Sequence, residues 1–141
     1  MYKIKKKLNP VRPELSIIIP VHNALPFLDK CLASLEKAKG IIFELILVND
    51  GSNQETVNYL SRFPQLNVIH HQQNLGFIES CHAGASRAIG KFLLFLNSDT
   101  ELIEPTSFKK MISIFTNNAK IGIVGARLIY ENNTIQHASL I

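Results

Sequence analysis

The sequence predicts an α/β protein in which a mostly parallel sheet is flanked by helices. From Leu15 onward, short β-rich runs alternate with amphipathic helical runs, which is the pattern of βαβ units. The chain has 141 residues, a length that suits one domain with one continuous core. Its composition, 46% hydrophobic and 18% charged, is that of an ordinary globular protein, so packing must stabilise the fold.

The first predicted strand is the run "LSIIIP" at residues 15–20, and Pro20 is expected to end it. A helix is expected next, with Pro26 in its first turn and Gly40 at its end. Apolar side chains recur along this helix at i, i+3, i+4 and i+7, which predicts one buried face. These side chains are Leu28, Cys31, Leu32 and Leu35.

The middle of the chain repeats this alternation. The second strand is expected at residues 43–49, and Ser52 followed three places later by Glu55 predicts a capping box that opens the second helix. The run "NVIHH" at residues 67–71 is the third predicted strand. The third helix is expected at residues 76–89, and the glycine that follows is expected to end it.

The fourth predicted strand, "KFLLFL" at residues 91–96, is almost entirely apolar. Such a run indicates burial on both faces, so we expect this strand near the centre of the sheet. A fourth helix is expected at about residues 105–117, where apolar residues again have helical spacing. Residues 121–130 and 135–141 then predict a strand pair at the edge of the sheet, joined by the turn "ENNT".

The formal charge of +4 is modest, and much of it lies in a basic N-terminal extension, residues 1–14, ahead of the domain at residues 15–141. The balanced remainder argues against a nucleic-acid groove. The extension is either a solvated, frayed terminus or a peripheral contact with anionic lipid at the inner face of a membrane. No apolar run approaches a membrane span or a signal peptide, so we expect a cytoplasmic protein. The basic side chains are Lys3, Lys5, Lys6 and Lys7.

The cysteines and histidines give no support for a metal site of their own. Cys31 and Cys81 each fall on the apolar face of a predicted helix, so we expect core packing rather than a disulfide. The histidines lack metal-ligand spacing, and each is expected to be a loop or core residue. They are His22, His70, His71, His82 and His137.

Polar residues follow each of the four predicted parallel strands. In open parallel sheets, ligands bind beyond the carboxyl ends of the strands, where the loops converge. Carboxylates, amides and glycine-bearing turns gathered there suit a polar, phosphorylated ligand. The four strand ends are "PVHN" at residues 20–23, "NDGS" at 49–52, "QNLG" at 73–76 and "NSDT" at 97–100.

Asp99 is an oxygen ligand at the exit of a buried-looking strand, and Asn97 and Thr100 supply further oxygens. Hard oxygen donors favour Mg²⁺ or Mn²⁺ over zinc. Taken alone, Asp99 also fits a helix cap or a turn, and Asp50 with Gly51 also fits an ordinary turn. The run "NLGF" opens a helix, whose N-terminus favours phosphate.

Three other nucleotide-handling classes are disfavoured, two of them by the first loop, "PVHNALPF", which contains no glycine. A dinucleotide-binding dehydrogenase needs the G-x-G-x-x-G turn there. A P-loop is also absent, because the chain contains no G-x-x-x-x-G-K-[ST]. A nucleotidyltransferase would open with a glycine-rich, basic loop, which this one is not.

Taken together, the four strand ends resemble a known family. The segments "LSIIIPVHNALPFLDKCLASL", "ELILVNDGSNQET", "HHQQNLGF" and "KFLLFLNSDTEL", in this order and spacing, are similar to the nucleotide-binding half of family 2 glycosyltransferases. These are inverting enzymes with the Rossmann-like GT-A fold. The resemblance covers about residues 15–138 and is closest to a rhamnosyltransferase-like branch, where Asn-x-Asp replaces Asp-x-Asp and a segment like "NTIQHAS" follows.

The resemblance implies a role for each strand end. Pro20, His22 and Asn23 would line the nucleobase and ribose pocket, with His22 at a place often held by Tyr. Asp50 would accept a hydrogen bond from the N–H of a uracil or thymine ring. The donor would therefore be a UDP- or dTDP-linked sugar.

Beside this nucleoside pocket, Asn74 and Gly76 would shape the wall near the sugar nucleotide. Asp99 would bind the Mg²⁺ or Mn²⁺ that bridges the diphosphate, with Asn97 as the first member of the triplet. Asn97 stands where most relatives have a carboxylate, which predicts a lower affinity for the metal.

The implied activity is metal-dependent, inverting transfer of a sugar, hexosyltransferase-like, to a glycan or lipid-linked acceptor in polysaccharide assembly. In the family, the catalytic base follows the strand pair, so we expect it downstream of Ile141. The chain is accordingly expected to be the truncated donor part of a longer transferase, with the C-terminal acceptor part missing. A second hypothesis remains open, a non-catalytic nucleotide-sugar-binding or homo-oligomerisation module.

Overall fold

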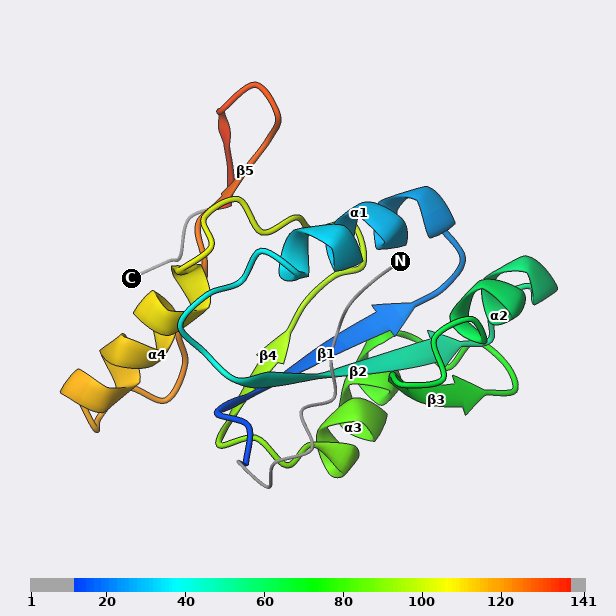
Figure 1. Ribbon diagram of the computed structural model, residues 1–141, viewed down its shortest axis with the longest axis horizontal. Helices are drawn as coiled ribbons and strands as arrows, with labels where there is room; N and C mark the ends of the chain where they lie inside the picture. Colours follow the sequence, from blue (N-terminus) through cyan, green and yellow to red (C-terminus); the bar gives the residue numbers. More distant parts are fainter. Residues whose placement is uncertain (1–11, 138–141) are drawn as a thin grey trace.

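The structure is a computed structural model, and it describes residues 12–137 (Figure 1). The lysine run at residues 3–7 and the end of the predicted last strand, residues 138–141, lie outside the described residues. The elements are β1 (Leu15–Val21), α1 (Leu25–Leu35), β2 (Phe43–Asp50), α2 (Gln54–Leu60), β3 (Asn67–His71), α3 (Phe77–Arg87), β4 (Phe92–Phe95), α4 (Ser107–Asn117), β5 (Leu128–Ile129) and β6 (Ile135–His137).

Four of the strands form a parallel sheet in the order β3-β2-β1-β4. Helices α1 and α4 cover one face of this sheet and α3 covers the other (Figure 1). The predicted α/β architecture, a parallel sheet flanked by helices, is confirmed. Because the strands are parallel, their carboxyl ends all lie along one edge.

Strand β1 crosses the middle of the core, and its apolar residues alternate between two clusters. Ile17 and Ile19 face α1 and α4, whereas Ile18 faces α3. Burying each such side chain contributes roughly 1.5 to 3 kcal/mol. Helix α3 lies close to the sheet at Gly84, where an added Cβ would lie 2.3 Å from Cγ2 of Ile18. Even an alanine at this position would therefore force the helix away from β1.

Strand β4 is not where its apolar sequence predicted. It lies at the edge of the four-stranded sheet, and Leu93 and Phe95 are each 47% exposed. Only the other face of β4, with Phe92 and Leu94, packs against the larger core. The amino-acid sequence shows that a strand is apolar, but the elements that pack beside it determine whether both of its faces are buried.

Helix α1 ends at Leu35, five residues before Gly40, the predicted end. The chain leaves the helix through two turn bonds, from Lys37 N to the oxygen of Ser34 and from Ala38 N to that of Leu35, 3.1 Å each. The next amide, Lys39 N, donates instead to the distant carbonyl of Pro105 at 2.8 Å. The helix therefore passes into a turn, and the amide that follows this turn bonds to a remote loop.

Three further element ends differ from the prediction. Pro20 does not end β1, which includes Val21, and α3 ends at Arg87 rather than residue 89. The predicted capping box of Ser52 is wrong, because Asn53 caps α2 by accepting from Thr56 N at 3.0 Å. The hydroxyl of Ser52 is used elsewhere, as the functional site shows.

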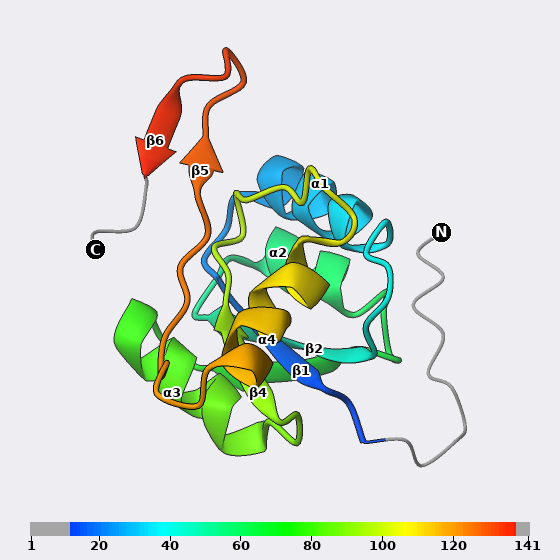
Figure 2. The same cartoon turned by 90° about the vertical axis from the view of Figure 1, so that its left-hand side faces the viewer.

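The predicted C-terminal strand pair forms, but it does not extend the main sheet. Strands β5 and β6 make a separate antiparallel hairpin, which projects beyond the α/β body (Figure 2). Of the predicted strand at residues 121–130, only Leu128–Ile129 is regular strand. Both cysteines are buried and free, as predicted. No helix within residues 12–137 has the length and apolar character to cross a membrane.

Candidate functional site

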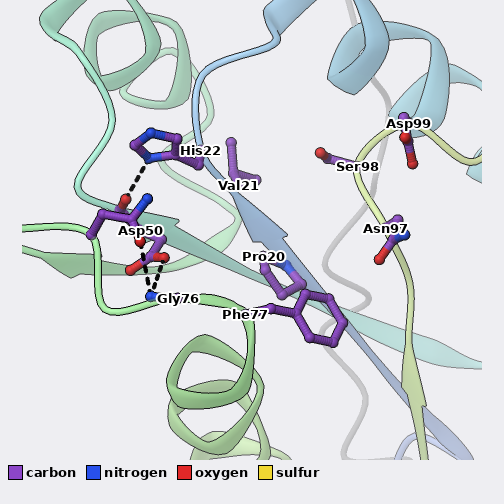
Figure 3. Close-up of a pocket in the computed structure, with 10 residues that line it drawn as sticks. Pro20, Val21, His22, Asp50, Gly76, Phe77, Asn97, Ser98 and Asp99 are labelled. Atoms are coloured by element: carbon purple, nitrogen blue, oxygen red, sulfur yellow. Dashed lines mark hydrogen bonds between the residues drawn. The ribbon is translucent and has the colours of Figure 1, made fainter.

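A pocket of about 340 Å³ lies at the carboxyl edge of the sheet, where all four strand ends meet (Figure 3). The predicted site residues are thus brought together, and all except Asn23 and Thr100 line the pocket. Its lining residues are Pro20, Val21, His22, Asp50, Asn74, Gly76, Phe77, Asn97, Ser98 and Asp99.

Asp50 is buried at one end of this pocket, at 4% exposure. Its Oδ1 accepts from Leu75 N at 2.8 Å and from His71 Nδ1 at 3.0 Å, and its Oδ2 accepts from Gly76 N at 2.9 Å. Burial alone would raise the pKa of Asp50, but the hydrogen bonds from His71 and the two amides outweigh it and hold the pKa below its usual value. Asp50 is therefore ionised at neutral pH, and Oδ2 retains an acceptor position.

His22 lies beside Asp50, on the loop after β1 (Figure 3). Its Nδ1 is 2.8 Å from the backbone oxygen of Asp50. Because a carbonyl only accepts, Nδ1 must carry the proton, and the bond fixes the plane of the imidazole ring. His22 is an exposed residue that lines the pocket.

Asn23 joins two loops beside the pocket. It has a positive φ of 60°, its Oδ1 accepts from Asn53 N at 2.9 Å, and its own N–H donates to Ser52 Oγ at 3.0 Å. The hydroxyl of Ser52 in turn donates to the oxygen of Val21 at 3.2 Å. Asn23 therefore holds the loop after β1 against the loop after β2.

Gly51 allows the loop after β3 to approach Asp50. Its φ is +63°, and an added Cβ would lie 2.3 Å from the carbonyl carbon of Gln73 and 2.4 Å from Asn74 N. No other residue type fits this contact, because the near atoms are backbone. The close approach brings the amides of Leu75 and Gly76 to the Asp50 carboxylate.

Asp99 lies at the opposite end of the pocket, on the loop after β4 (Figure 3). It is exposed, and within residues 12–137 its carboxylate has no hydrogen bond or ion pair. Asn97 and Ser98 add neutral oxygens on the same loop. In the described part of the chain, no three His, Cys, Asp or Glu side chains gather into a metal site.

These oxygens nevertheless fit a magnesium- or manganese-type ion. Such ions are commonly held by one or two carboxylates together with substrate phosphates and water, rather than by a complete protein cage. One unpaired carboxylate facing a pocket matches that arrangement. Nitrogen or sulfur ligands, which zinc prefers, do not line the Asp99 side of the pocket.

The sequence analysis did not assign Val21, Phe77 or Ser98 to the site. Phe77 is 53% exposed, and its ring lies beside Pro20, between the Asp50 and Asn97 sides of the pocket (Figure 3). The run "NLGF" contained this residue, but a phenylalanine at a helix start normally indicates core packing. A half-exposed aromatic ring in a polar pocket offers a flat apolar surface to a ligand.

A parallel α/β sheet with a polar pocket at its carboxyl edge defines a Rossmann-like ligand-binding domain. The family model described as glycosyl transferase family 2 matches residues 16–139. The chain belongs to this family.

Known relatives and structures agree with this assignment. A PGL/p-HBAD biosynthesis glycosyltransferase of Mycobacterium bovis is 30% identical over 128 residues, 88% of this chain and 50% of the relative. The crystal structure of Staphylococcus aureus TarS 1–349 in complex with UDP has a TM-score of 0.64 at 24% identity, covering 74% of this chain and 32% of that one. A mannosyltransferase of Pyrobaculum calidifontis, in complex with GDP-Man and Mn²⁺, has a TM-score of 0.68 at 15% identity, covering 75% and 33%.

The fold is therefore the GT-A glycosyltransferase fold, as predicted. The chain spans half the length of the mycobacterial relative and about a third of each structure.

Proposed function

We propose that this domain binds the nucleoside-diphosphate-sugar donor of an inverting, metal-dependent glycosyltransferase. The observation that carries the proposal is the pairing of two carboxylates in one pocket. Asp50 is buried and ionised with one acceptor position left, whereas Asp99 is exposed and has no partner in the described part of the chain. A nucleoside diphosphate has a base at one end and a diphosphate at the other, which suits this arrangement.

The nucleobase is proposed to lie at the Asp50 end. An ionised carboxylate only accepts hydrogen bonds, so it favours a ring that presents an N–H, such as uracil or thymine. Adenine and cytosine present a ring nitrogen lone pair at the corresponding position, which would face the carboxylate unfavourably. Pro20 and the exposed ring of Phe77 supply apolar surface against which the base or the ribose can pack. Guanine also presents a ring N–H, so the carboxylate alone does not separate it from uracil and thymine. UDP- and dTDP-linked sugars are the proposed donors because of the resemblance of the strand ends, and titration of GDP beside UDP tests that choice.

The diphosphate is proposed to lie at the Asp99 end. Asp99, with oxygens of Asn97 and Ser98, would hold Mg²⁺ or Mn²⁺ there. A bound divalent ion stabilises the negative charge that develops on a departing diphosphate. The mannosyltransferase from P. calidifontis, described with GDP-Man and Mn²⁺, supports this reading by analogy.

The proton acceptor is proposed to come from outside the described residues. Asp50 and Asp99 are the carboxylates that line the pocket within residues 12–137, and both are assigned to the donor. Inversion requires a base within hydrogen-bond reach of the attacking hydroxyl. That base and the site for a glycan or lipid-linked acceptor belong, in this proposal, to the part of the longer relatives that this chain does not span.

Calorimetric titration of UDP and dTDP, with and without Mn²⁺, tests the proposal. We expect binding that Mn²⁺ strengthens in the wild type, and loss of the Mn²⁺ effect in Asp99→Ala. Glu101→Gln is the matched control, because it removes one negative charge from an exposed side chain of the same loop that does not line the pocket. Absence of binding to the wild type under every condition would overturn the proposal. CDP and ADP should bind more weakly than UDP if Asp50 reads the base.

A further inference from the structure

Helix α1 and the turn after it hold the segment of residues 97–105, here termed the acidic loop, at three points. The thiol of Cys31 lies 3.9 Å from the oxygen of Asn97, and Ser34 Oγ lies 2.8 Å from Leu102 N. Further along, Lys39 N donates to the oxygen of Pro105 at 2.8 Å. The first two contacts bracket Asp99.

Ser34 makes the central contact, and both of its hydrogen-bonding functions are used. The side chain is buried, with the residue at 2% exposure. Its hydroxyl donates to the oxygen of Cys31 at 2.7 Å, one helical turn back, and accepts from Leu102 N at 2.8 Å. The bond to Cys31 fixes the hydroxyl rotamer, so that a lone pair is directed at the acidic loop.

The position of Asp99 depends on these anchors because its side chain has no hydrogen bond or ion pair of its own within residues 12–137. Within residues 97–102, the backbone makes one local turn bond, from Thr100 N to the oxygen of Asn97 at 3.2 Å. A turn of this kind can move as a unit unless its ends are held. Leu102 is the anchored end, and its side chain also packs against the larger core.

We propose that Ser34 is a positioning residue for Asp99, which holds the acidic loop in the orientation that directs the Asp99 carboxylate at the bound cation and diphosphate. The inference rests on the proposed function, because it assumes that Asp99 holds the cation. Ser34 lies on α1 and does not line the pocket, so it acts only through the loop. Groups that hydrogen-bond a metal-ligating side chain directly typically change metal affinity by about 10- to 100-fold. Ser34 bonds the backbone three residues from Asp99, so we expect an effect at the lower end of this range.

The test compares two affinities of the same variant. UMP, titrated without metal, reports the Asp50 end of the pocket, and the gain in UDP affinity on adding Mn²⁺ reports the Asp99 end. In Ser34→Ala we expect the Mn²⁺ gain to fall by about tenfold and the UMP affinity to stay within about twofold of the wild type. Ser34→Thr, which keeps the hydroxyl, should recover most of the gain.

Ser113→Ala is the matched control. Ser113 on α4 makes the same bond to the carbonyl one turn back, Lys110, at 2.6 Å, but it is exposed and has no bond to the acidic loop. We expect both affinities of this variant to equal those of the wild type. If Ser34→Ala does not fold, as judged by circular dichroism, Ser34→Cys replaces it, because a thiol is a weaker acceptor than a hydroxyl.

The outcomes separate this inference from the proposed function. If Mn²⁺ does not change the affinity of the wild type for UDP, both the proposed metal-dependent function and the positioning role of Ser34 are overturned. A wild-type Mn²⁺ gain that Ser34→Ala retains would overturn only the positioning role. Equal losses of UMP and UDP affinity in Ser34→Ala would also overturn it, since they would show a general structural effect.

Discussion

The two carboxylates of the pocket have the same chemistry but differ in burial and in hydrogen bonding. Asp50 is buried, and three donors from two other segments hold its oxygens in place. Asp99 is exposed and has no hydrogen bond or ion pair within the described residues. The first carboxylate is thus part of the folded framework, whereas the second depends on its backbone for orientation.

This difference shows how one pocket can combine a rigid end with an end completed by its ligand. Hydrogen bonds from His71, Leu75 and Gly76 use part of the acceptor capacity of Asp50, and they keep the carboxylate charged despite burial. Nothing in the described structure neutralises Asp99, so a bound cation would interact with the full negative charge of this carboxylate. Removal of the two carboxylates should therefore affect different measurements.

The largest expected effect is on folding. Asp50→Asn replaces an acceptor-only group with an amide, whose N–H₂ must face at least one of the existing donors. We expect the free energy of unfolding in urea to fall by roughly 2 to 4 kcal/mol. Glu101→Gln, the same charge change at an exposed side chain, should stay within about 0.5 kcal/mol of the wild type. If Asp50→Asn is as stable as the wild type, the proposed difference between a structural carboxylate at Asp50 and a ligand-binding one at Asp99 is wrong.

Asp99→Asn should give the opposite pattern. Without ligand, we expect its free energy of unfolding to stay within about 0.5 kcal/mol of the wild type, because the carboxylate is exposed and unpaired. UDP with Mn²⁺ at about ten times the dissociation constant should stabilise the wild type by about 1.4 kcal/mol, and in the variant this gain should fall to the smaller gain that UDP gives without Mn²⁺. Denaturation with and without ligand measures both quantities, and a variant that keeps the gain would show that Asp99 does not hold the cation.

Phe77→Ala tests the surface between the two ends. The ring is 53% exposed, so we expect little change in stability. If the ring packs against the base or ribose, UMP affinity should fall by about three- to tenfold, the equivalent of about 0.5 to 1.5 kcal/mol for an aromatic contact. Phe27→Ala is the control, because Phe27 is 55% exposed on α1 and does not line the pocket. Equal UMP affinity in the two variants would exclude Phe77 from the binding surface.

The pH dependence of stability should follow Asp50. Its folded-state pKa is held below the usual value of about 3.9, so its contribution is fully present above that pH and is lost as pH falls through the folded pKa. We expect the wild type to lose stability on acidification below about pH 4, and Asp50→Asn to lack this component. The stability that the wild type loses on acidification should be smaller than the stability lost at neutral pH through the Asp50→Asn substitution. The reason is that a protonated carboxyl group keeps part of its acceptor capacity. Urea denaturation between neutral and acidic pH measures it, and identical profiles would contradict the assignment.

Several features could be read from the sequence because they depend on neighbouring residues. The spacing of apolar residues predicts the four parallel strands and the helices between them, and Pro26 does lie in the first turn of α1. Parallel strands end at one edge of a sheet, so the polar strand ends had to meet there, and the pocket lining confirms it. The family also followed from these segments, because their order and spacing are properties of the chain itself.

Other features depended on residues that are distant in sequence. The amide of Lys39, just after α1, bonds to the distant carbonyl of Pro105. Asn53 rather than Ser52 caps α2, and the hydroxyl of Ser52 bonds to Val21 and Asn23 instead. The edge position of β4 depends on which elements pack beside it, which an apolar run does not specify.

The sequence by itself determined the fold class, the family and the set of polar residues at the strand ends, because each is encoded by local spacing. Only the tertiary structure decided that Asp50 is bonded by three donors while Asp99 has no partner in the described part of the chain. It also decided that Ser34 on α1 contacts the acidic loop, 68 residues away in sequence. Such contacts arise when packing brings remote donors and acceptors together. The sequence shows which residues can donate or accept a hydrogen bond, but it does not show which of them will pair.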